Sequence, residues 1–423
     1  MDSLLWQILS IIRLAPILKN KVMNIVKHVL SLSLGVLSLT ISAQPKPVAH
    51  PLELPFETEQ ARTEIVLPKV NGMNFYKADL HIHTIFSDGD VTPDMRVLEA
   101  WRDGLDAIAI TDHMEYRRIE RDMLNFMDKY IRDDIRQEGD AVNTNIMRNG
   151  PDERGILVDF NVAYDLAVKK ARDYGILVVR GVEITRKRYG DYNAIFTTDN
   201  NAIYDPDIEQ AIANARAQGA FIVHNHPDYD ANTHNLLTEL SNGLYAKALI
   251  DGVEVANKSK IWWHLFDYAF NGGYTPMANS DAHEYLVWRY GSPDDYKIPR
   301  YRNMNLILAE SLTEQNLHNA LKAGNTIAYC NNNLIGRTEL LQGLFEASTE
   351  FRIERSTNTQ HHVVVVNKSS LPYYFLLGKK EYILNAMGTL HLTIPKDSDG
   401  VTVEVLNMWN GNEQHPRVSV ELK

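Results

Sequence analysis

The chain has 423 residues, of which 44% are hydrophobic and 23% charged, a composition typical of a soluble globular protein with room for a barrel and a small second module. Its net charge of −11 argues against a nucleic-acid backbone as the main partner, because it has no surplus of basic residues. The single cysteine, Cys330, excludes an intrachain disulfide and a thiolate zinc cluster, so any metal must be held by nitrogen and oxygen ligands.

Residues 1–43 are typical of an export signal. Counting from Met23, Lys27 supplies a positive charge and the apolar run 29–41 is too short for a comfortable membrane span. Met23 is therefore the expected true start, and a second membrane-active helix over residues 1–22 is the alternative. We expect an exported protein, periplasmic or extracellular, with no stable membrane span after cleavage of the signal.

Residues 44–74 form a proline-rich lead-in, and residues 75–340 then alternate short apolar runs with helical patterns. This alternation predicts a parallel α/β architecture, and the number of units suits a closed barrel. The expected strands are 75–82, 107–111, 177–182, 193–196, 221–224, 252–255, 276–279 and 305–308. The expected helices are 92–103, 157–174, 206–218, 234–241, 260–271 and 313–323.

Two segments depart from this alternation. Residues 116–156 form a charged insertion after the strand 107–111, where it would overlie the active face of a barrel; substrate contact and a solvated excursion without a role are both open. Residues 346–423 contain successive strand patterns with no helix between them. They predict a small antiparallel β module of the sandwich type, with a structural or interaction role.

Side chains that bind metals recur where the expected strands end. In the run Asp79-Leu80-His81-Ile82-His83, the strand period of two puts both histidines on one face. Because the carboxyl ends of parallel strands meet at one rim of a barrel, we expect these side chains to gather around divalent cations. The candidates are His81, His83, Asp88, His113, Glu183, Asp191, His224, His226, Asp281 and His283.

Some neighbouring polar residues have other expected roles. Asp112 should brace its loop and hold the ring of His113 instead of binding metal. His224 and His226 share a face if their strand continues, so which of them is the ligand stays open. The remaining histidines are assigned to the surface or to packing: His234, His264, His318, His361, His362, His391 and His415.

The order of these motifs resembles the polymerase-and-histidinol-phosphatase (PHP) superfamily over about residues 75–330. The motifs are, in chain order, His-x-His, Ser-Asp-Gly, Thr-Asp-His, Gly-Val-Glu, Asn-His-Pro and Ser-Asp-Ala-His. The runs Glu183-Ile184-Thr185-Arg186 and Asn193-Ala194-Ile195-Phe196, the export signal and the trailing β module are most similar to the secreted branch named after a Sphingobium phosphodiesterase (Sb-PDE).

The resemblance implies a distorted (β/α)7 TIM-like barrel that holds two or three divalent ions, either manganese, zinc or iron. By position, the first ion would be held by His81, His83, Glu183 and Asp281. The second would share Glu183 and add His226 and a residue near position 191, and the third would be held by Asp88, His113 and His283. The family usually has a histidine where this chain has Asp191, so the second site would differ in affinity or metal preference, or be empty.

These features predict a metal-dependent hydrolase of small-molecule phosphate esters, with diesters favoured by the branch resemblance alone. A metal-bridging hydroxide would attack, Glu183 would bridge the ions, and Asp281 or His283 would pass a proton to the leaving group. Arg186 is the expected phosphate clamp, because a guanidinium matches two phosphoryl oxygens. Arg117, Arg118 and Lys258 are weaker candidates for this clamp, and each is assigned in the first place to the surface. The oligomeric state stays open.

Other classes of protein are compatible with the same residues. An amidohydrolase-type barrel also begins with His-x-His, although such enzymes often bridge their metals with a carbamylated lysine where this chain has Glu183. An exported metal-binding protein that Asp191 has disabled as a catalyst is the second alternative. A polymerase-associated exonuclease fits poorly with an acidic, exported chain.

Overall fold

The computed structural model describes residues 62–114, 159–186, 190–227, 239–287, 300–398 and 400–423. The predicted export signal, most of the proline-rich lead-in and the insertion 116–156 lie outside these residues, as do Arg117, Arg118 and His234. Within the described ranges, no helix combines the length and the apolar character needed to cross a membrane.

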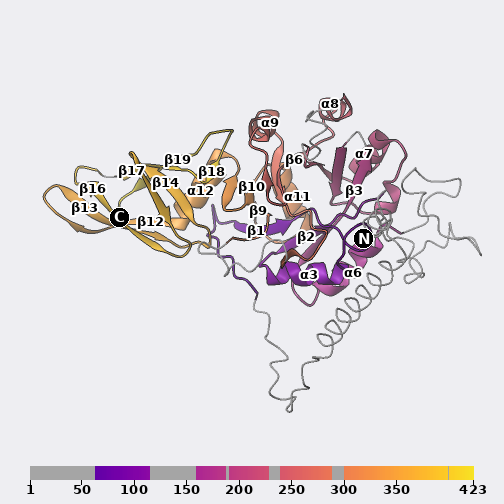
Figure 1. The fold of residues 1–423 in the computed structure, drawn as a ribbon, viewed down its shortest axis with the longest axis horizontal. Coiled ribbons are helices and arrows are strands. Elements are labelled where there is room, and N and C mark those ends of the chain that lie inside the picture. Colours follow the sequence, from indigo (N-terminus) through magenta and orange to yellow (C-terminus); the bar gives the residue numbers. More distant parts are fainter. Residues whose placement is uncertain (1–61, 115–158, 187–189, 228–238, 288–299, 399) are drawn as a thin grey trace, which may run out of the picture. The chain divides into compact units, whose positions relative to one another are not determined.

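A mixed 12-stranded sheet carries the candidate site (Figure 1). Its strand order is β18-β11-β10-β9-β1-β2-β3-β4-β5-β6-β7, and β8 pairs with β6 off this path. The strands are β1 (Asn74–Asp79), β2 (Ala107–Ile110), β3 (Leu177–Arg186), β4 (Gly190–Ile195), β5 (Phe221–Asn225), β6 (Gly252–Asn257), β7 (Lys260–Ile261), β8 (Thr275–Asn279), β9 (Met304–Ala309), β10 (Thr326–Cys330), β11 (Asn333–Ile335) and β18 (Met408–Trp409).

The expectation of a parallel sheet is corrected in part. Strands β1, β2 and β3 are parallel, and so are β5, β6 and β8, but β4 is antiparallel to both of its neighbours and β9 is antiparallel to β1. Only residues 187–189 separate β3 from β4, which is too short for the crossover that a parallel pair needs. The chain is therefore a mixed α/β fold, and the count of seven β/α units stays a prediction.

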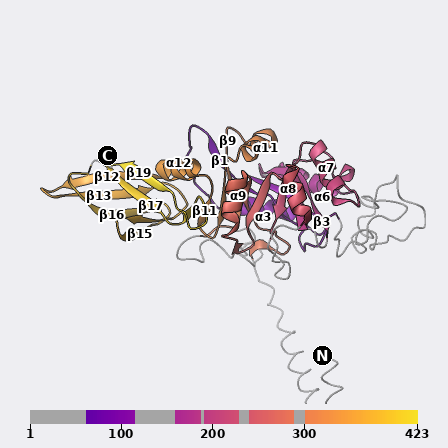
Figure 2. The same ribbon diagram turned by 90° about the horizontal axis from the view of Figure 1, so that it is seen from above.

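Helices cover the sheet. They are α3 (Pro93–Arg102), α6 (Val162–Ala171), α7 (Ile208–Ala217), α8 (Glu239–Ala246), α9 (Leu265–Gly272), α11 (Glu314–Lys322) and α12 (Thr338–Ser348), with a short 3-10 turn η3 (Asn200–Ala202). Helix α7 begins where the Asp207 carboxylate accepts the amides of Glu209 and Gln210, and Thr313 caps α11 in the same way. Helices α3 and α6 lie side by side and pack on β2 and β3 (Figure 1), and Figure 2 shows the same ribbon from above.

Strand β8 meets β1 without a regular ladder, and side chains make the join. The Leu80 amide donates to the side chain of Asn279, at 2.9 Å, and the Ser280 amide donates to Asp79, at 3.1 Å. Just beyond the strands, the Asp281 amide donates to the His81 carbonyl at 3.0 Å, and the His83 amide to that of Ala282 at 3.0 Å. This join sets the His-x-His run directly beside the Asp-x-His run.

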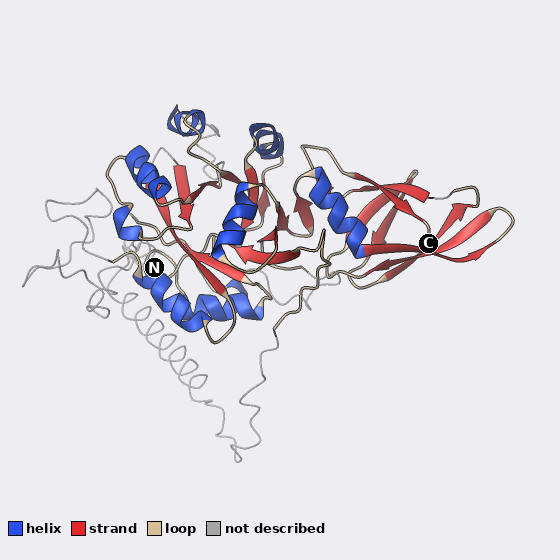
Figure 3. Cartoon of the chain, turned by 180° about the vertical axis from the view of Figure 1, so that it is seen from behind, coloured by secondary structure: helices blue, strands red, loops and turns tan. Residues whose placement is uncertain are grey.

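The C-terminal residues form two antiparallel sheets, drawn in red with the rest of the strands in Figure 3. One contains β12 (Thr349–Ser356), β13 (Gln360–Asn367) and β16 (Thr389–Pro395); the other contains β15 (Lys380–Leu384), β14 (Tyr373–Leu377), β17 (Gly400–Val405) and β19 (Arg417–Glu421). Alternate residues such as Val363, Val365, Phe375 and Val403 enter one hydrophobic cluster with Phe345 of α12. Strand β18 instead pairs with β11, so this part of the chain extends the large sheet.

Candidate metal centre

The predicted ligands from five strands meet at one place. His81 and His83 follow β1, His113 follows β2, Glu183 lies in β3, His226 follows β5, and Asp281 and His283 follow β8. Three groups of His, Asp and Glu side chains can be distinguished, and within each group the possible ligand atoms all lie within 4.8 Å of one another. They are His81, His83 and Asp281; His81, Glu183 and His226; and His83, Asp88, His113 and His283.

The first group, together with Glu183 of the second, has the spacing of atoms that share one cation. His81 Nε2 lies 3.1 Å from His83 Nε2, 3.3 Å from Glu183 Oε2 and 3.5 Å from Asp281 Oδ1. His83 Nε2 lies 3.2 Å from each of the same two carboxylate oxygens. Two ligands on one tetrahedral ion with bonds of about 2.1 Å are about 3.4 Å apart. The side chains that the sequence assigns to the first ion therefore fit a divalent metal.

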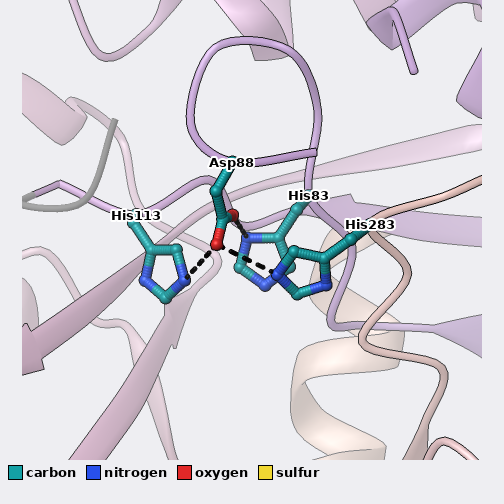
Figure 4. A group of neighbouring side chains, drawn as sticks. All are labelled: His83, Asp88, His113 and His283. Atoms are coloured by element: carbon teal, nitrogen blue, oxygen red, sulfur yellow. Dashed lines mark ion pairs between the residues drawn. The ribbon is translucent and has the colours of Figure 1, made fainter. Parts of the chain in front are cut away.

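The third group surrounds Asp88 (Figure 4). Asp88 Oδ2 lies 3.2 Å from His283 Nε2 and 3.7 Å from His113 Nε2, and Asp88 Oδ1 lies 3.5 Å from His83 Nδ1. The rings of His113 and His283 both stack against the ring of His83, with their centroids 4.6 and 4.2 Å from its centroid. Because His83 already directs Nε2 at the first group, Asp88, His113 and His283 are the side chains left for another ion.

The second group is more open. His226 Nε2 lies 3.8 Å from Glu183 Oε1, while Asp191 Oδ2 lies 3.9 Å from the other ring nitrogen, Nδ1. Asp191 thus stands near His226 but is not part of the mutually close group. His224 is elsewhere: its Nδ1 hydrogen-bonds the Tyr245 hydroxyl at 2.8 Å. Of the two histidines that the sequence left open, His226 is the one beside Glu183.

Burial and charge act against each other in the cluster. Burial by itself raises the pKa of Glu183 and of Asp281, but the surrounding imidazoles hold both values well below the usual range. Burial lowers the pKa of His83, yet hydrogen bonds and charges from Asp281 and Glu183 outweigh it and raise the value to about 10. The histidines and carboxylates therefore compensate one another, and a cation that binds them must displace protons.

The backbone is strained at three residues of the centre. His226, Lys258 and Asp281 have φ values of 25°, 54° and 48°, in a region that residues with a Cβ seldom adopt. Such residues are held in place only where surrounding contacts compensate the cost.

Asp112 braces the loop, as the sequence predicted. Its Oδ1 accepts the Thr84 amide at 2.7 Å and the Ser87 hydroxyl at 2.6 Å, and its Oδ2 accepts the Thr84 hydroxyl at 2.6 Å. The hydroxyl of Thr185 contacts His113 Nδ1 at 2.8 Å. Asp112 thus fixes the turn that carries Asp88, while Thr185 contacts the ring of His113 directly.

Two residues at the centre differ from expectation. Lys258, assigned to the surface, places Nζ 3.1 Å from Asp281 Oδ2 and is only 29% exposed, because the turn after β6 carries it inward. Glu254 of β6 is fully buried and contacts His81 Nδ1 at 2.9 Å, although the sequence predicted no role for it. A glutamate between two valines in a short, mostly apolar strand is the signal that could have found it.

The remaining candidates either lie outside the described residues or do not belong to the three groups. The side chain of Arg186, the expected phosphate clamp at the end of β3, lies outside the described part of the chain. Among the residues that are described, the three metal-binding groups include none of the histidines assigned to the surface or packing.

Comparison with known proteins agrees with this geometry. Residues 79–284 match the family model of the PHP domain, as the motif order predicted. A two-domain protein from Bacteroides vulgatus that contains a predicted PHP-like metal-dependent phosphoesterase is 27% identical, with a TM-score of 0.73 over 86% of this chain and 99% of its own. No protein with curated annotation matches the chain.

Other solved structures resemble it only distantly. A metal-dependent phosphoesterase from Bifidobacterium adolescentis, described as such only provisionally, is 16% identical with a TM-score of 0.33, covering 49% of this chain and 88% of its own. The lesion-specific endonuclease PfuEndoQ from Pyrococcus furiosus is 16% identical with a TM-score of 0.37, covering 67% of this chain and 63% of its own. Likeness this slight says nothing about the reaction of the present chain.

Proposed function

We propose that this chain is a metal-dependent hydrolase of small-molecule phosphate esters, acting on diesters in preference to monoesters. The observation that carries the proposal is the first group with Glu183 of the second group beside it, where five contacts of 3.1–3.5 Å join two histidines and two carboxylates. The PHP-domain match and the Bacteroides vulgatus relative support the same reaction class. The diester preference and the Sb-PDE branch rest on the motif resemblance alone.

Two or three manganese, zinc or iron ions would be held by the residues of the three groups, with Glu183 between the first and second. Bound there, such ions supply a hydroxide nucleophile near neutral pH and neutralise phosphoryl oxygens. We further propose that the protein is exported to the periplasm or beyond, with the barrel in residues 75–340 and a β module in 346–423.

The chain's own residues would bind and orient the substrate. Among the described residues, Lys258 is joined to the cluster by its ion pair with Asp281. Its ammonium group would contact a phosphoryl oxygen of the substrate beside Asp281.

His283 is placed to move a proton. Its side chain is 25% exposed, more than those of the other first- and third-group histidines, and its Nδ1 contacts the Asp281 carbonyl at 3.0 Å. A partly exposed imidazole can pass a proton between the leaving group and solvent. We assign this role to His283 in the form with two ions, in which its Nε2 holds no metal, and the bridging role to Glu183.

The open second group favours one alternative, an exported metal-binding protein without turnover. Asp191 stands 3.9 Å from His226 Nδ1, on the other ring nitrogen from the one that faces Glu183. If the second ion is needed and does not bind, the chain would take up metal and hydrolyse nothing. An amidohydrolase reaction is less well supported, because a glutamate occupies the bridging position.

Activity assays on the full chain test the proposal. Purified protein supplied with Mn²⁺ is assayed against aryl phosphodiesters and monoesters, amides, lactones and DNA. His83→Ala and Asp281→Ala should abolish diester turnover, whereas His391→Ala, a matched change at a histidine that is 72% exposed in β16, should not. Retained activity in both site variants would refute the assignment, and metal uptake without any turnover would favour the binding protein.

A further inference from the structure

Glu254 contacts two different metal-binding groups at once. Its Oε1 lies 2.9 Å from His81 Nδ1, and its Oε2 accepts the backbone amide of His226 at 2.9 Å. His81 belongs to the first group and to the second, and His226 belongs to the second. We propose that Glu254 is a positioning residue that orients the ligands of both groups and so sets the metal affinity of both.

The first contact decides which nitrogen of His81 is free to bind metal. A carboxylate only accepts hydrogen bonds, so the ring must carry its proton on Nδ1 when it faces Glu254. The lone pair is then on Nε2, which is the atom that lies 3.1–3.5 Å from His83, Glu183 and Asp281. A buried carboxylate behind a metal-binding histidine is a recurrent way to hold the ring and raise its basicity.

The second contact holds the backbone of His226. This residue has φ 25°, a strained conformation, and its amide is directed at Glu254 Oε2. The ring of His226 stacks on that of His81 with centroids 5.7 Å apart, and its Nε2 points toward Glu183. Loss of the carboxylate would therefore release the ligand side chain of the second group together with that of the first.

The local sequence explains why the carboxylate reaches both ligands. Glu254 is fully buried in β6, and the pairing of β6 with β8 shifts register between Glu254 and Ala256. Irregularities of this kind re-aim a side chain and are common beside active sites. Asn279 donates to Oε1 at 2.8 Å and Asn257 to Oε2 at 2.9 Å, so four donors saturate the carboxylate.

Glutamine is the informative replacement because it keeps the shape and changes one acceptor oxygen into an NH2 donor group. Whichever way the amide of Glu254→Gln turns, it presents N–H groups either to the His81 side or to the His226 side. We expect the affinity for Zn²⁺ to fall about 10- to 100-fold, the usual effect of losing such a contact. Asn257→Ala is the matched control, since it removes a buried donor to Glu254 without touching a metal ligand.

The test measures Zn²⁺ binding to the full chain by competition with a chelating dye, with urea unfolding in chelator as a check of folding. The inference is supported if Glu254→Gln weakens Zn²⁺ binding while Asn257→Ala, with a similar loss in the free energy of unfolding, keeps an affinity for Zn²⁺ within about tenfold of that of the original chain. It is overturned if both bind Zn²⁺ alike, or if Glu254→Gln binds as the original chain does.

A second measurement tests the inference even if Glu254→Gln does not fold, because it uses the original chain. Long-range ¹H–¹⁵N spectra of the original chain loaded with Zn²⁺ should show the His81 proton on Nδ1, and a proton on Nε2 would overturn the inference. The inference rests on the metal centre of the proposed function, but the readout is metal binding and not turnover. An original chain that binds no Zn²⁺ would refute both, whereas normal binding by Glu254→Gln would refute this one alone.

Discussion

Arg96 offers the sharpest test of how the protein holds its metal-binding loops. The side chain is fully buried in α3 although it carries a charge. Its guanidinium pairs with Glu99 at 2.7 Å and donates, at 2.7–3.0 Å, to four backbone carbonyls, those of His83, Ala282, His283 and Glu284. One side chain thus ties the end of the His-x-His run to the Asp-x-His run.

Arg96→Met should be strongly destabilising. It leaves Glu99, which is 3% exposed, as an unpaired buried charge, and losing one partner of a buried pair costs about 3–5 kcal/mol. The carbonyls of Ala282 and His283 keep the backbone amides of His83 and Asp90 as donors, so the further cost, about 1–3 kcal/mol for each group that water does not reach, falls on the carbonyls of His83 and Glu284, and these costs overlap. In Arg96→Met combined with Glu99→Gln, the unpaired charge is gone, so we expect about 1–3 kcal/mol to be recovered.

Urea unfolding in chelator, followed by tryptophan fluorescence, gives the free energies of unfolding. Arg417→Met is the matched control, because its ion pair with Glu404 is 72% exposed on the arginine side and should contribute less than about 1 kcal/mol. The reasoning is refuted if Arg96→Met costs no more than this control. It is equally refuted if the double variant is less stable than the single one.

Three further outcomes follow from the site. Lys258→Met should raise KM for an aryl phosphodiester about 10- to 100-fold with little change in kcat, and Lys258→Arg should recover part of it; steady-state kinetics showing a loss confined to kcat would contradict this. Asp112→Ala, which strands three donors, should lower the free energy of unfolding in urea by about 1–3 kcal/mol, and an unchanged value would count against the brace. Asp191→His should increase Zn²⁺ bound per chain, measured by elemental analysis, unless His226 cannot share an ion with position 191.

The sequence indicated which side chains could gather at one place because most of them follow a strand. The period of two in the His-x-His run and the positions of Glu183 and Asp281 could be read locally, and they predicted one meeting point. The same local reasoning assigned Asp112 to the loop, since a residue beside a candidate ligand commonly supports it. The helices α3, α7 and α11 also follow their expected ranges, because capping and apolar spacing are local signals, whereas the expected helix 260–271 begins only at Leu265, after the short strand β7.

The sequence could not predict contacts between residues far apart in the chain. Glu254 reaches His81 across 173 positions, and Arg96 reaches the carbonyl of Glu284 across 188. Whether a lysine such as Lys258 faces solvent or Asp281 depends on the turn that follows β6, which no periodicity reveals. The antiparallel β4 and the side-chain join between β1 and β8 were likewise missed, because strand patterns give neither direction nor neighbour.

The amino-acid order by itself determined which side chains can bind a cation and that they follow strands, since ligand chemistry and strand period are properties of short segments. Only the tertiary structure decided how those side chains are held, because burial and hydrogen bonding depend on every element that packs around them. That is why His226 and not His224 stands beside Glu183, and why a buried glutamate lies behind His81.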